Sequence, residues 1–534
     1  MAKRFLFLLT ACFVGAAALA GALLCERKSD IRAQRPTLEC TDETILQLPY
    51  FDLLAAGNEN RHLPTDVESY SLGDGMIHLI LPEAVSPNAV AVYIRDKEGN
   101  YLARRVYDFT GKVMIGPWEV VLEHPSIPTV YFESEDPSVF SALNASADKN
   151  IICDGNMHIC VGEEDSKENG WYREYLSASG DGSYKTTASL QGRGSTSWDV
   201  DRKRSYSLRL KRSENLLGLG KNRNWNLIGN VFDRSLIRNV TFNEISRRAG
   251  IDYQPNMIDV NLYVDGVYQG VYTLTTKISR NKNRVALRGG DYFYRLDPPE
   301  PENPITYESM AWFGDGLAYP AADLLYPEMP SGREFAEASD ILQTFITARD
   351  DPNVPGFDEI CDLDSLARYY WIQEASMNFD ACSRSTYFYY LRNDSKVHFG
   401  PVWDLDLTLG SPYEKEKVDF SGPEGWKIRE LGWYSRLFMR PEFVSAVYDV
   451  YYNGGVREAL LGGTAEFEKQ RAILADEGRL NFLFYGSPIE YEVPTDHGSD
   501  YDSYCDNMID FYKKRVQWID AEMEAGRGTG VTSP

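Results

Sequence analysis

Short runs in which hydrophobic and polar residues alternate dominate residues 68–123. The runs at 76–81, 89–94 and 101–107 are rich in β-branched and aromatic residues, and turn-forming residues separate them. This pattern is typical of strands joined by turns, and it predicts a small all-β domain of sandwich type. Residues 29–67 are more polar and contain three prolines, so they are predicted to be a linker with one short helix.

After residue 126 the pattern becomes a mixture of strands and helices. One helix is predicted to begin after Asp233, which would cap it, and to run to about Arg248, because apolar residues recur there at helical spacing. Strand patterns surround this helix at 185–191, 205–210, 257–264 and 270–275. A strand-like segment also begins near Thr129.

Helical spacing prevails in the remainder of the chain. The predicted helices are 332–349, 363–378, 443–450, 465–477 and 501–525, with strands at 387–391 and 397–399. Residues 297–355 are interpreted as an insertion, and 528–534 as a flexible tail. The predicted fold class is therefore α+β, with one large domain over 126–527 whose C-terminal part is helical.

The first 28 residues are interpreted as a signal peptide or a membrane anchor. Lys3 and Arg4 precede an apolar run over 5–24, which is long enough to span a bilayer. Ala18-Leu19-Ala20 fits a cleavage site, whereas Arg27 and Lys28 favour a retained anchor. Both readings stay open, and both predict an extracytoplasmic protein that meets a membrane only through this segment.

Charge excludes one class of partner. The 534 residues include 55 Lys and Arg against 79 Asp and Glu, which leaves a net charge of −24. A nucleic-acid-binding protein needs clustered cations to neutralise phosphates, so DNA and RNA are not expected partners. An acidic surface would instead attract a protein rich in Lys or Arg.

Six cysteines lie beyond the export segment: Cys40, Cys153, Cys160, Cys361, Cys382 and Cys505. In an oxidising compartment they could form three disulfides, and Cys153 with Cys160 could close a small loop. Free buried thiols are the alternative. Their spacing does not fit a zinc site.

A glycine-rich turn is the first candidate for chemistry. Gly192-Arg193-Gly194-Ser195-Thr196-Ser197-Trp198 lies between two predicted strands, and Lys203 follows. Glycines allow backbone N–H groups to approach an anion, and Arg193 and Lys203 add positive charge. The segment could therefore hold a phosphate group, although a simple hairpin turn is the alternative.

Two acidic motifs follow the predicted helix at 363–378. Asp380 comes directly after that helix and could accept a proton from a substrate hydroxyl. Asp404 and Asp406 flank Leu405, and in an extended segment both would point to the same side. Mg²⁺ prefers one or two carboxylates together with substrate phosphates, so this pair is a candidate metal site.

The order of these parts is that of protein-kinase phosphoryl transfer: phosphate loop, lysine, a glutamate on a helix (here Glu244), catalytic aspartate and metal aspartate. Five ordered motifs resemble the spore-coat protein H (CotH) kinase family. They are the segments at 192–206, 225–239, 262–272, 378–380 and 401–406, and weaker similarity extends through 515–520.

The resemblance implies an atypical protein-kinase-like domain that uses ATP and Mg²⁺ or Mn²⁺ to phosphorylate Ser on a protein. By position, Asp380 resembles the catalytic base, and Asp404 the metal ligand, with Asp406 as its support. Arg193, Gly194, Ser195 and Lys203 resemble the phosphate-binding residues, and Glu244 the partner of Lys203. Ser385 stands where relatives often place an asparagine metal ligand, five residues after the catalytic aspartate.

Departures from the family pattern leave other functions open. Besides Ser385, Ser195 replaces an asparagine and Thr276 replaces a glutamate. These changes allow a non-catalytic pseudokinase that serves as a cell-surface or spore-coat scaffold or adhesin. A metal-dependent glycosyltransferase is a further alternative, because Asp404-Leu405-Asp406 matches the D-x-D pattern of metal–diphosphate sites.

Overall fold

The structure, a computed structural model, describes part of the chain in detail. It covers strands between 51 and 123, and then 126–161, 183–194, 196–199, 203–265, 267–282, 284–296, 304–306, 321–410, 414–415, 417–485 and 498–528. The predicted export segment, the helix expected near 43–48 and Ser195 lie outside the described residues.

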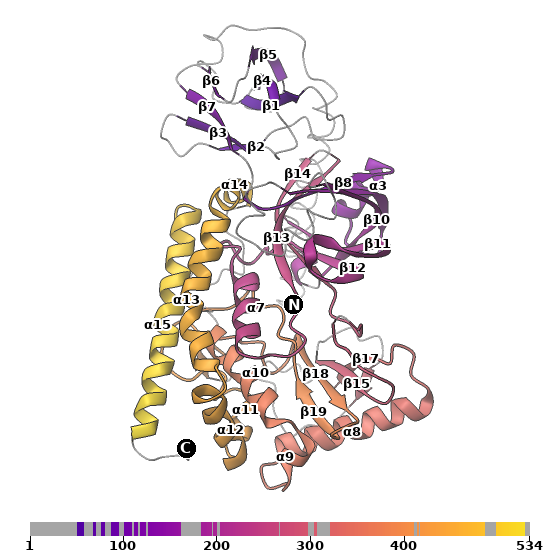
Figure 1. The fold of residues 1–534 in the computed structure, drawn as a ribbon, viewed down its shortest axis with the longest axis vertical. Coiled ribbons are helices and arrows are strands. Elements are labelled where there is room, and N and C mark those ends of the chain that lie inside the picture. The colour runs from indigo at the N-terminus through magenta and orange to yellow at the C-terminus, as the bar shows by residue number, and fades with distance from the viewer. Residues whose placement is uncertain are drawn as a thin grey trace, which may run out of the picture. The chain divides into compact units, whose positions relative to one another are not determined.

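The N-terminal strands form two small sheets (Figure 1). One has the order β1-β4-β5 and the other β2-β3-β7-β6. Their bounds are β1 (Phe51–Gly57), β2 (Glu68–Tyr70), β3 (Met76–Ile80), β4 (Pro87–Arg95), β5 (Tyr101–Asp108), β6 (Lys112–Ile115) and β7 (Trp118–Glu123). The runs of alternating residues therefore form strands, as predicted. Residues 51–57 are a strand rather than linker, because Phe51 to Ala56 pair with β4.

A closed β-barrel follows, in the order β10-β11-β12-β14-β13-β8-β9. Its strands are β8 (Thr129–Ser134), β9 (Ile152–Cys160), β10 (Ser183–Arg193), β11 (Ser205–Asn215), β12 (Lys221–Ile228), β13 (Met257–Val264) and β14 (Val267–Thr276). Alternate residues such as Leu190, Leu208, Trp225, Leu262 and Leu274 fill the core, because every second side chain of a strand faces the same side. The parallel β8–β13 pair closes the barrel.

A second sheet has the order β16-β17-β15-β18-β19. Its strands are β15 (Tyr292–Leu296), β16 (Pro304–Thr306), β17 (Ala321–Tyr326), β18 (Thr386–Leu391) and β19 (Lys396–Phe399). The region interpreted as an insertion thus contributes β16 and β17 to the same sheet as the β18–β19 hairpin. Short strands β20 (Glu414–Lys415) and β21 (Val418–Asp419) pair separately.

The helices are concentrated in the C-terminal half. They are α3 (Pro137–Ala145), α6 (Thr196–Asp199), α7 (Arg238–Arg248), α8 (Gly332–Asp350), α9 (Phe357–Ile360), α10 (Leu363–Ser376), α11 (Tyr434–Leu437), α12 (Pro441–Tyr452), α13 (Val456–Ile473), α14 (Ala475–Tyr485) and α15 (Tyr501–Gly528). The mixed α+β class and its helical C-terminal part are confirmed. Among the described helices, none is long and apolar enough to cross a membrane.

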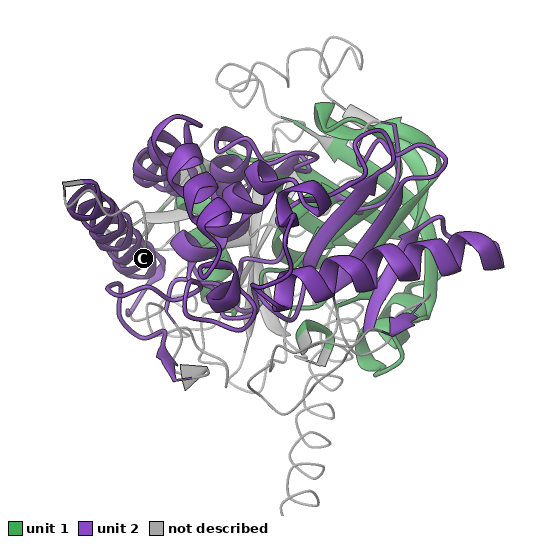
Figure 2. Ribbon diagram, turned by 90° about the horizontal axis from the view of Figure 1, so that it is seen from below, with its two compact units in different colours: residues 1–231, 258–275, 473–486 green, residues 232–257, 276–472, 487–534 purple. Residues whose placement is uncertain are grey.

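The chain divides into two compact units (Figure 2). Unit 1 comprises residues 1–231, 258–275 and 473–486, and it contains the barrel and α14. Unit 2 comprises 232–257, 276–472 and 487–534, and it contains the second sheet and most helices. The segment predicted as one domain over 126–527 therefore contributes to both.

One helix begins later than predicted. Asp233 accepts hydrogen bonds from Ser235 N (3.0 Å) and Arg238 N (2.9 Å). The aspartate therefore caps a turn that leads into α7, and the helix itself begins at Arg238.

The possible disulfide between Cys153 and Cys160 is not formed. Cys153 and Cys160 lie at opposite ends of β9, so their Cα atoms are about 23 Å apart at a rise of about 3.3 Å per residue. A disulfide needs Cα atoms within about 7 Å. Among the described residues, Cys153, Cys361, Cys382 and Cys505 are buried thiols outside any disulfide.

Candidate active site

Helix α10 of unit 2 carries the first acidic motif at its C-terminal end. The helix is buried on nearly all sides, including Tyr369, Trp371 and Glu374. Met377 ends it in the left-handed region, with φ 56°. A buried helix whose end is sharply defined gives the following loop a fixed starting point.

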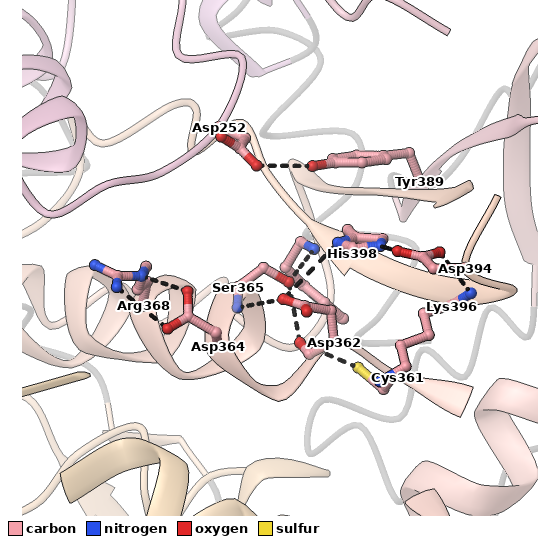
Figure 3. Close-up of polar contacts among 11 residues, drawn as sticks. Asp252, Cys361, Asp362, Asp364, Ser365, Arg368, Tyr389, Asp394, Lys396 and His398 are labelled. Carbon is pink, nitrogen blue, oxygen red and sulfur yellow. Dashed lines mark hydrogen bonds and ion pairs between the residues drawn. The ribbon is translucent and has the colours of Figure 1, made fainter. Parts of the chain in front are cut away.

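Contacts with the β18–β19 hairpin hold the other end of α10 in place (Figure 3). Asp362 caps the helix by accepting from Ser365 N at 2.8 Å, and its own backbone N–H donates to Val397 O at 2.9 Å. Phe399 N donates to Ser365 Oγ at 3.1 Å. His398 lies on the same hairpin, with Nε2 2.9 Å from Asp394 Oδ2 and its ring stacked on Tyr389. These contacts fix the position of α10 within unit 2.

The loop that holds Asp380 is built by its own hydrogen bonds. Asn378 Nδ2 donates to Gln373 Oε1 at 2.8 Å, and Asn378 Oδ1 accepts from Asp380 N at 3.1 Å. The Asp380 carbonyl accepts from Ser383 N and Arg384 N. The Asp380 side chain keeps 31% of its surface exposed, with Arg384 Nε 4.0 Å away. A carboxylate held at this level of exposure can meet a substrate hydroxyl.

The second acidic motif lies in the loop 400–410, which two neighbouring elements hold. Leu405 N donates to Asn239 Oδ1 on α7 at 3.0 Å. Leu409 N donates to Ser376 O at the end of α10 at 2.9 Å. The end of α10 therefore supports both acidic loops, and α7 supports the second.

Asp404 and Ser385 come together across these two loops. Ser385 Oγ donates to Asp404 Oδ2 at 3.1 Å. Both residues adopt positive φ, 63° for Asp404 and 47° for Ser385. Such backbone conformations are strained for side chains other than glycine, and they concentrate at functional sites. Two residues that the family resemblance implies as metal ligands are thus neighbours.

Asp404 and Asp406 have different environments. Asp404 is exposed, whereas Asp406 keeps only 8% of its surface exposed. The segment is not extended as expected, because Asp404 adopts a left-handed φ and a turn begins at Asp406. Burial, and then the nearby charges of Asp404 and Asp233, raise the pKa of Asp406 well above its usual range.

A buried ion pair lies near Asp406. Arg238 Nη1 and Asp233 Oδ1 are 2.5 Å apart, and both side chains are fully buried. Arg238 partly offsets the rise in the Asp406 pKa. Burial is the largest cause of the upward shift, and repulsion by the Asp404 and Asp233 carboxylates adds to it. A bound cation would relieve this repulsion.

The donor set fits Mg²⁺ or Mn²⁺. Asp404, Asp406 and the Ser385 hydroxyl supply hard oxygen donors, and two carboxylates completed by substrate phosphates are typical of magnesium in phosphoryl transfer. No group of three or more His, Cys, Asp and Glu side chains suited to a metal occurs in the part of the chain that the structure describes.

In unit 1, the glycine-rich turn is tightly folded. Gly194 has φ 99°, and a Cβ there would lie 2.2 Å from Ser197 Oγ. A Cβ on Gly192 would lie 2.5 Å from the Trp198 ring. Lys149 Nζ donates to Gly194 O at 3.2 Å. Glycine is thus required at both positions, and Arg193 between them is partly exposed.

Lys203 lies two residues before β11 and is 3% exposed. Its Nζ donates to Val271 O at 2.5 Å and to Asn481 Oδ1 at 2.7 Å. Glu244, its expected partner, has different contacts: Arg247 Nη1 at 2.7 Å and Arg248 Nε at 3.0 Å, both on its own helix. The contacts of Glu244 therefore do not include Lys203.

Several supporting residues were assigned no role from the sequence. Asn239 and Arg238 fall inside the motif at 225–239, so a signal for them existed. Glu374 forms a fully buried ion pair with Arg515 of α15, and its carboxylate also accepts from Lys427 N and Arg429 N at 2.7 and 2.8 Å. Asn481 had no sequence signal, because it lies 278 residues from Lys203.

Comparison with known families finds one matching family. Residues 190–519 match the family described as CotH kinase protein, which is more than half of the chain. The chain belongs to the CotH kinase family. No curated protein matches it significantly.

Proposed function

We propose that this protein transfers the γ-phosphate of ATP to a Ser hydroxyl of a protein substrate, with a divalent metal. The observation that carries the proposal is the Ser385–Asp404 contact, which joins the loop of Asp380 to the candidate metal loop. We propose an atypical protein-kinase-like fold together with this activity. Membership in the CotH kinase family supports it.

Asp380 is proposed as the catalytic base. Its loop keeps the carboxylate partly exposed, so it can accept the proton of the substrate hydroxyl as that oxygen attacks the γ-phosphorus. The bond between the γ-phosphorus and the bridging oxygen then breaks, and ADP leaves. Arg193 and Lys203 would neutralise phosphate charge, and the backbone around Gly194 would approach the phosphates closely.

Asp404, Asp406 and Ser385 would hold the metal. When bound, Mg²⁺ or Mn²⁺ would neutralise charge on the phosphates. The raised pKa of Asp406 has a consequence here, because a metal ligand must lose its proton. Metal binding is therefore expected to release a proton and to weaken as pH falls.

The partners follow from charge and from the N-terminal segment. With a net charge of −24, we expect a substrate rich in Lys or Arg, steered by the acidic surface. The apolar N-terminal segment, which lies outside the described residues, supports an extracytoplasmic protein, secreted or anchored.

Nucleotide binding and phosphate transfer test the proposal separately. We expect ATP with Mg²⁺ or Mn²⁺, but not a UDP-sugar, to raise the melting temperature of the full chain. Labelled γ-phosphate should then appear on Ser of a basic protein. Asp380→Asn should abolish transfer but keep binding, and Asp340→Asn, on the exposed face of α8, serves as the control.

The outcomes distinguish the alternatives. Binding without transfer in the unaltered protein would indicate a pseudokinase scaffold. Stabilisation by a nucleotide sugar instead of ATP would indicate a glycosyltransferase. No response to any nucleotide would overturn the proposal and favour an adhesin.

A further inference from the structure

Lys203 is held by a helix from the far end of the chain. Helix α14 belongs to unit 1, and its residue Asn481 is 4% exposed beside the lysine. Asn481 Oδ1 accepts from Lys203 Nζ at 2.7 Å and from Val271 N on β14 at 3.0 Å. The Val271 carbonyl accepts from the same ammonium at 2.5 Å. One amide oxygen therefore fixes both the lysine and the strand beside it.

The backbone of β14 is shaped to admit this contact. Gly270 has φ 98°, and a Cβ there would lie 2.5 Å from Asn481 Oδ1 and 3.0 Å from Lys203 Cε. Any larger residue would displace the amide or the lysine. Gly270 occurs within the segment 262–272 that resembles the family, and the structure shows one physical reason for a glycine there.

Aromatic rings complete the surroundings of the ammonium. Its Nζ lies 5.2 Å from the centre of the Tyr272 ring and 5.3 Å from that of Tyr485. Tyr485 also donates its hydroxyl to Gln269 O at 3.0 Å, which ties the end of α14 to β14. Aromatic faces favour a cation without cancelling its charge.

We propose that Asn481 is the positioning residue for Lys203, in the role that the sequence assigned to Glu244. This inference rests on the proposed function. The chemistry of the partner distinguishes the two residues. A carboxylate would form an ion pair and neutralise the lysine, whereas an amide oxygen orients the ammonium and leaves its positive charge for a phosphate.

Glu244 has partners of its own. Its carboxylate is engaged by Arg247 and Arg248 on its own helix. In this protein, orientation of the phosphate-binding lysine therefore depends on the C-terminal helix α14.

Asn481→Asp tests the proposal, because the two side chains have nearly the same shape and differ in charge. The new carboxylate can still accept from Lys203, so we expect the melting temperature to stay the same or rise. The Kd for ATP, measured by calorimetry without turnover, should increase about tenfold or more, since the ammonium would be shared with a carboxylate. Asn224→Asp adds the same charge at an exposed position of unit 1 and should leave the Kd unchanged.

A second variant approaches the same contact from the strand. Gly270→Ala should also weaken ATP binding, because its methyl group displaces the Asn481 amide. A folded Asn481→Asp protein that binds ATP as tightly as the unaltered one would overturn the proposal and leave Asn481 a purely structural residue. Failure of the unaltered protein to bind ATP would instead contradict the proposed function.

Discussion

Two regions of this protein solve opposite electrostatic problems. The lysine cluster of unit 1, defined by Lys203, Gly270, Val271, Tyr272, Asn481 and Tyr485, buries a cation among neutral oxygens and aromatic rings. The acid loops of unit 2, at 377–385 and 400–410, keep Asp380 and Asp404 accessible while Asp406 is buried against like charge.

This difference in charge environment indicates which ligand each region can bind. Two acceptors of the lysine ammonium, Val271 O and Asn481 Oδ1, are neutral and do not cancel its charge. The acid loops carry an excess of negative charge, which is unfavourable until a cation binds. We therefore expect changes in the lysine cluster to alter nucleotide binding, and changes in the acid loops to alter transfer and metal binding.

The largest effect should separate transfer from binding. Asp380→Asn removes the proton acceptor, so we expect transfer to fall by about 10²- to 10⁴-fold, the usual contribution of a general base. ATP binding should stay within about twofold of the unaltered protein. Single-turnover transfer and calorimetry would measure the two. Equal losses in the transfer rate and in the affinity for ATP would mean that Asp380 also positions the nucleotide. That result would contradict the assignment of binding to the lysine cluster and of transfer to the acid loops.

The next effect concerns the support behind the acid loops. Arg515→Leu leaves the Glu374 carboxylate buried without its charge partner. Breaking a fully buried pair in this way lowers the free energy of unfolding by about 3–5 kcal/mol. Urea denaturation would measure it.

A matched change at the surface serves as the comparison for that loss. Lys514→Leu, the neighbouring residue on α15, removes an exposed pair with Asp510. It should lower the free energy of unfolding by less than about 1 kcal/mol. Similar losses of unfolding free energy in Arg515→Leu and Lys514→Leu would contradict the view that the buried Glu374–Arg515 pair stabilises unit 2.

A smaller effect should appear as pH dependence. The pKa of Asp406 is raised in the folded protein, so the folded state holds its proton more tightly than the unfolded state does. Without metal, the free energy of unfolding should therefore fall as pH rises from about 4 through the raised pKa. Mg²⁺ or Mn²⁺ should restore stability at the high end of this range.

Asp406→Asn provides the check on that pH dependence. It should flatten the dependence and remove part of the stabilisation by metal. Thermal melting from pH 4 to pH 9 would show this. A slope that Asp406→Asn leaves unaltered would assign the titration to another group.

The smallest effect should come from Ser385. Ser385→Asn introduces the amide that relatives often carry, beside Asp404. We expect the apparent Kd for Mn²⁺ in the presence of ATP to decrease by up to about tenfold, because an amide oxygen is a good ligand for a hard cation. Ser383→Asn, in the same loop, is the control. Weaker metal binding in Ser385→Asn would show that the hydroxyl itself is required there.

Much of the fold could be predicted from local patterns. The strands β10, β11, β13 and β14 and the helices α8, α10, α12 and α15 lie close to where alternation and helical spacing placed them. Strands β9 and β12 were missed, since their polar residues hide the alternation and only pairing within the barrel defines them. Likewise, β1 pairs with a strand 30 or more residues away.

For the candidate site, residue types and their order along the chain were enough to select Asp380, Asp404, Asp406, Arg193 and Lys203 as candidates, and to indicate the family. These candidates could be selected because the features that mark them are local. An acidic residue after a predicted helix, or a glycine-rich turn followed by a lysine, can be recognised in the sequence alone.

Only the tertiary structure decided the partners. It placed Ser385 against Asp404, separated the environments of Asp404 and Asp406, and gave Lys203 to Asn481 while Glu244 remained with its own helix. Burial and hydrogen bonding depend on which distant segments pack together. That packing pairs groups from segments far apart along the chain, and no single segment of sequence records it.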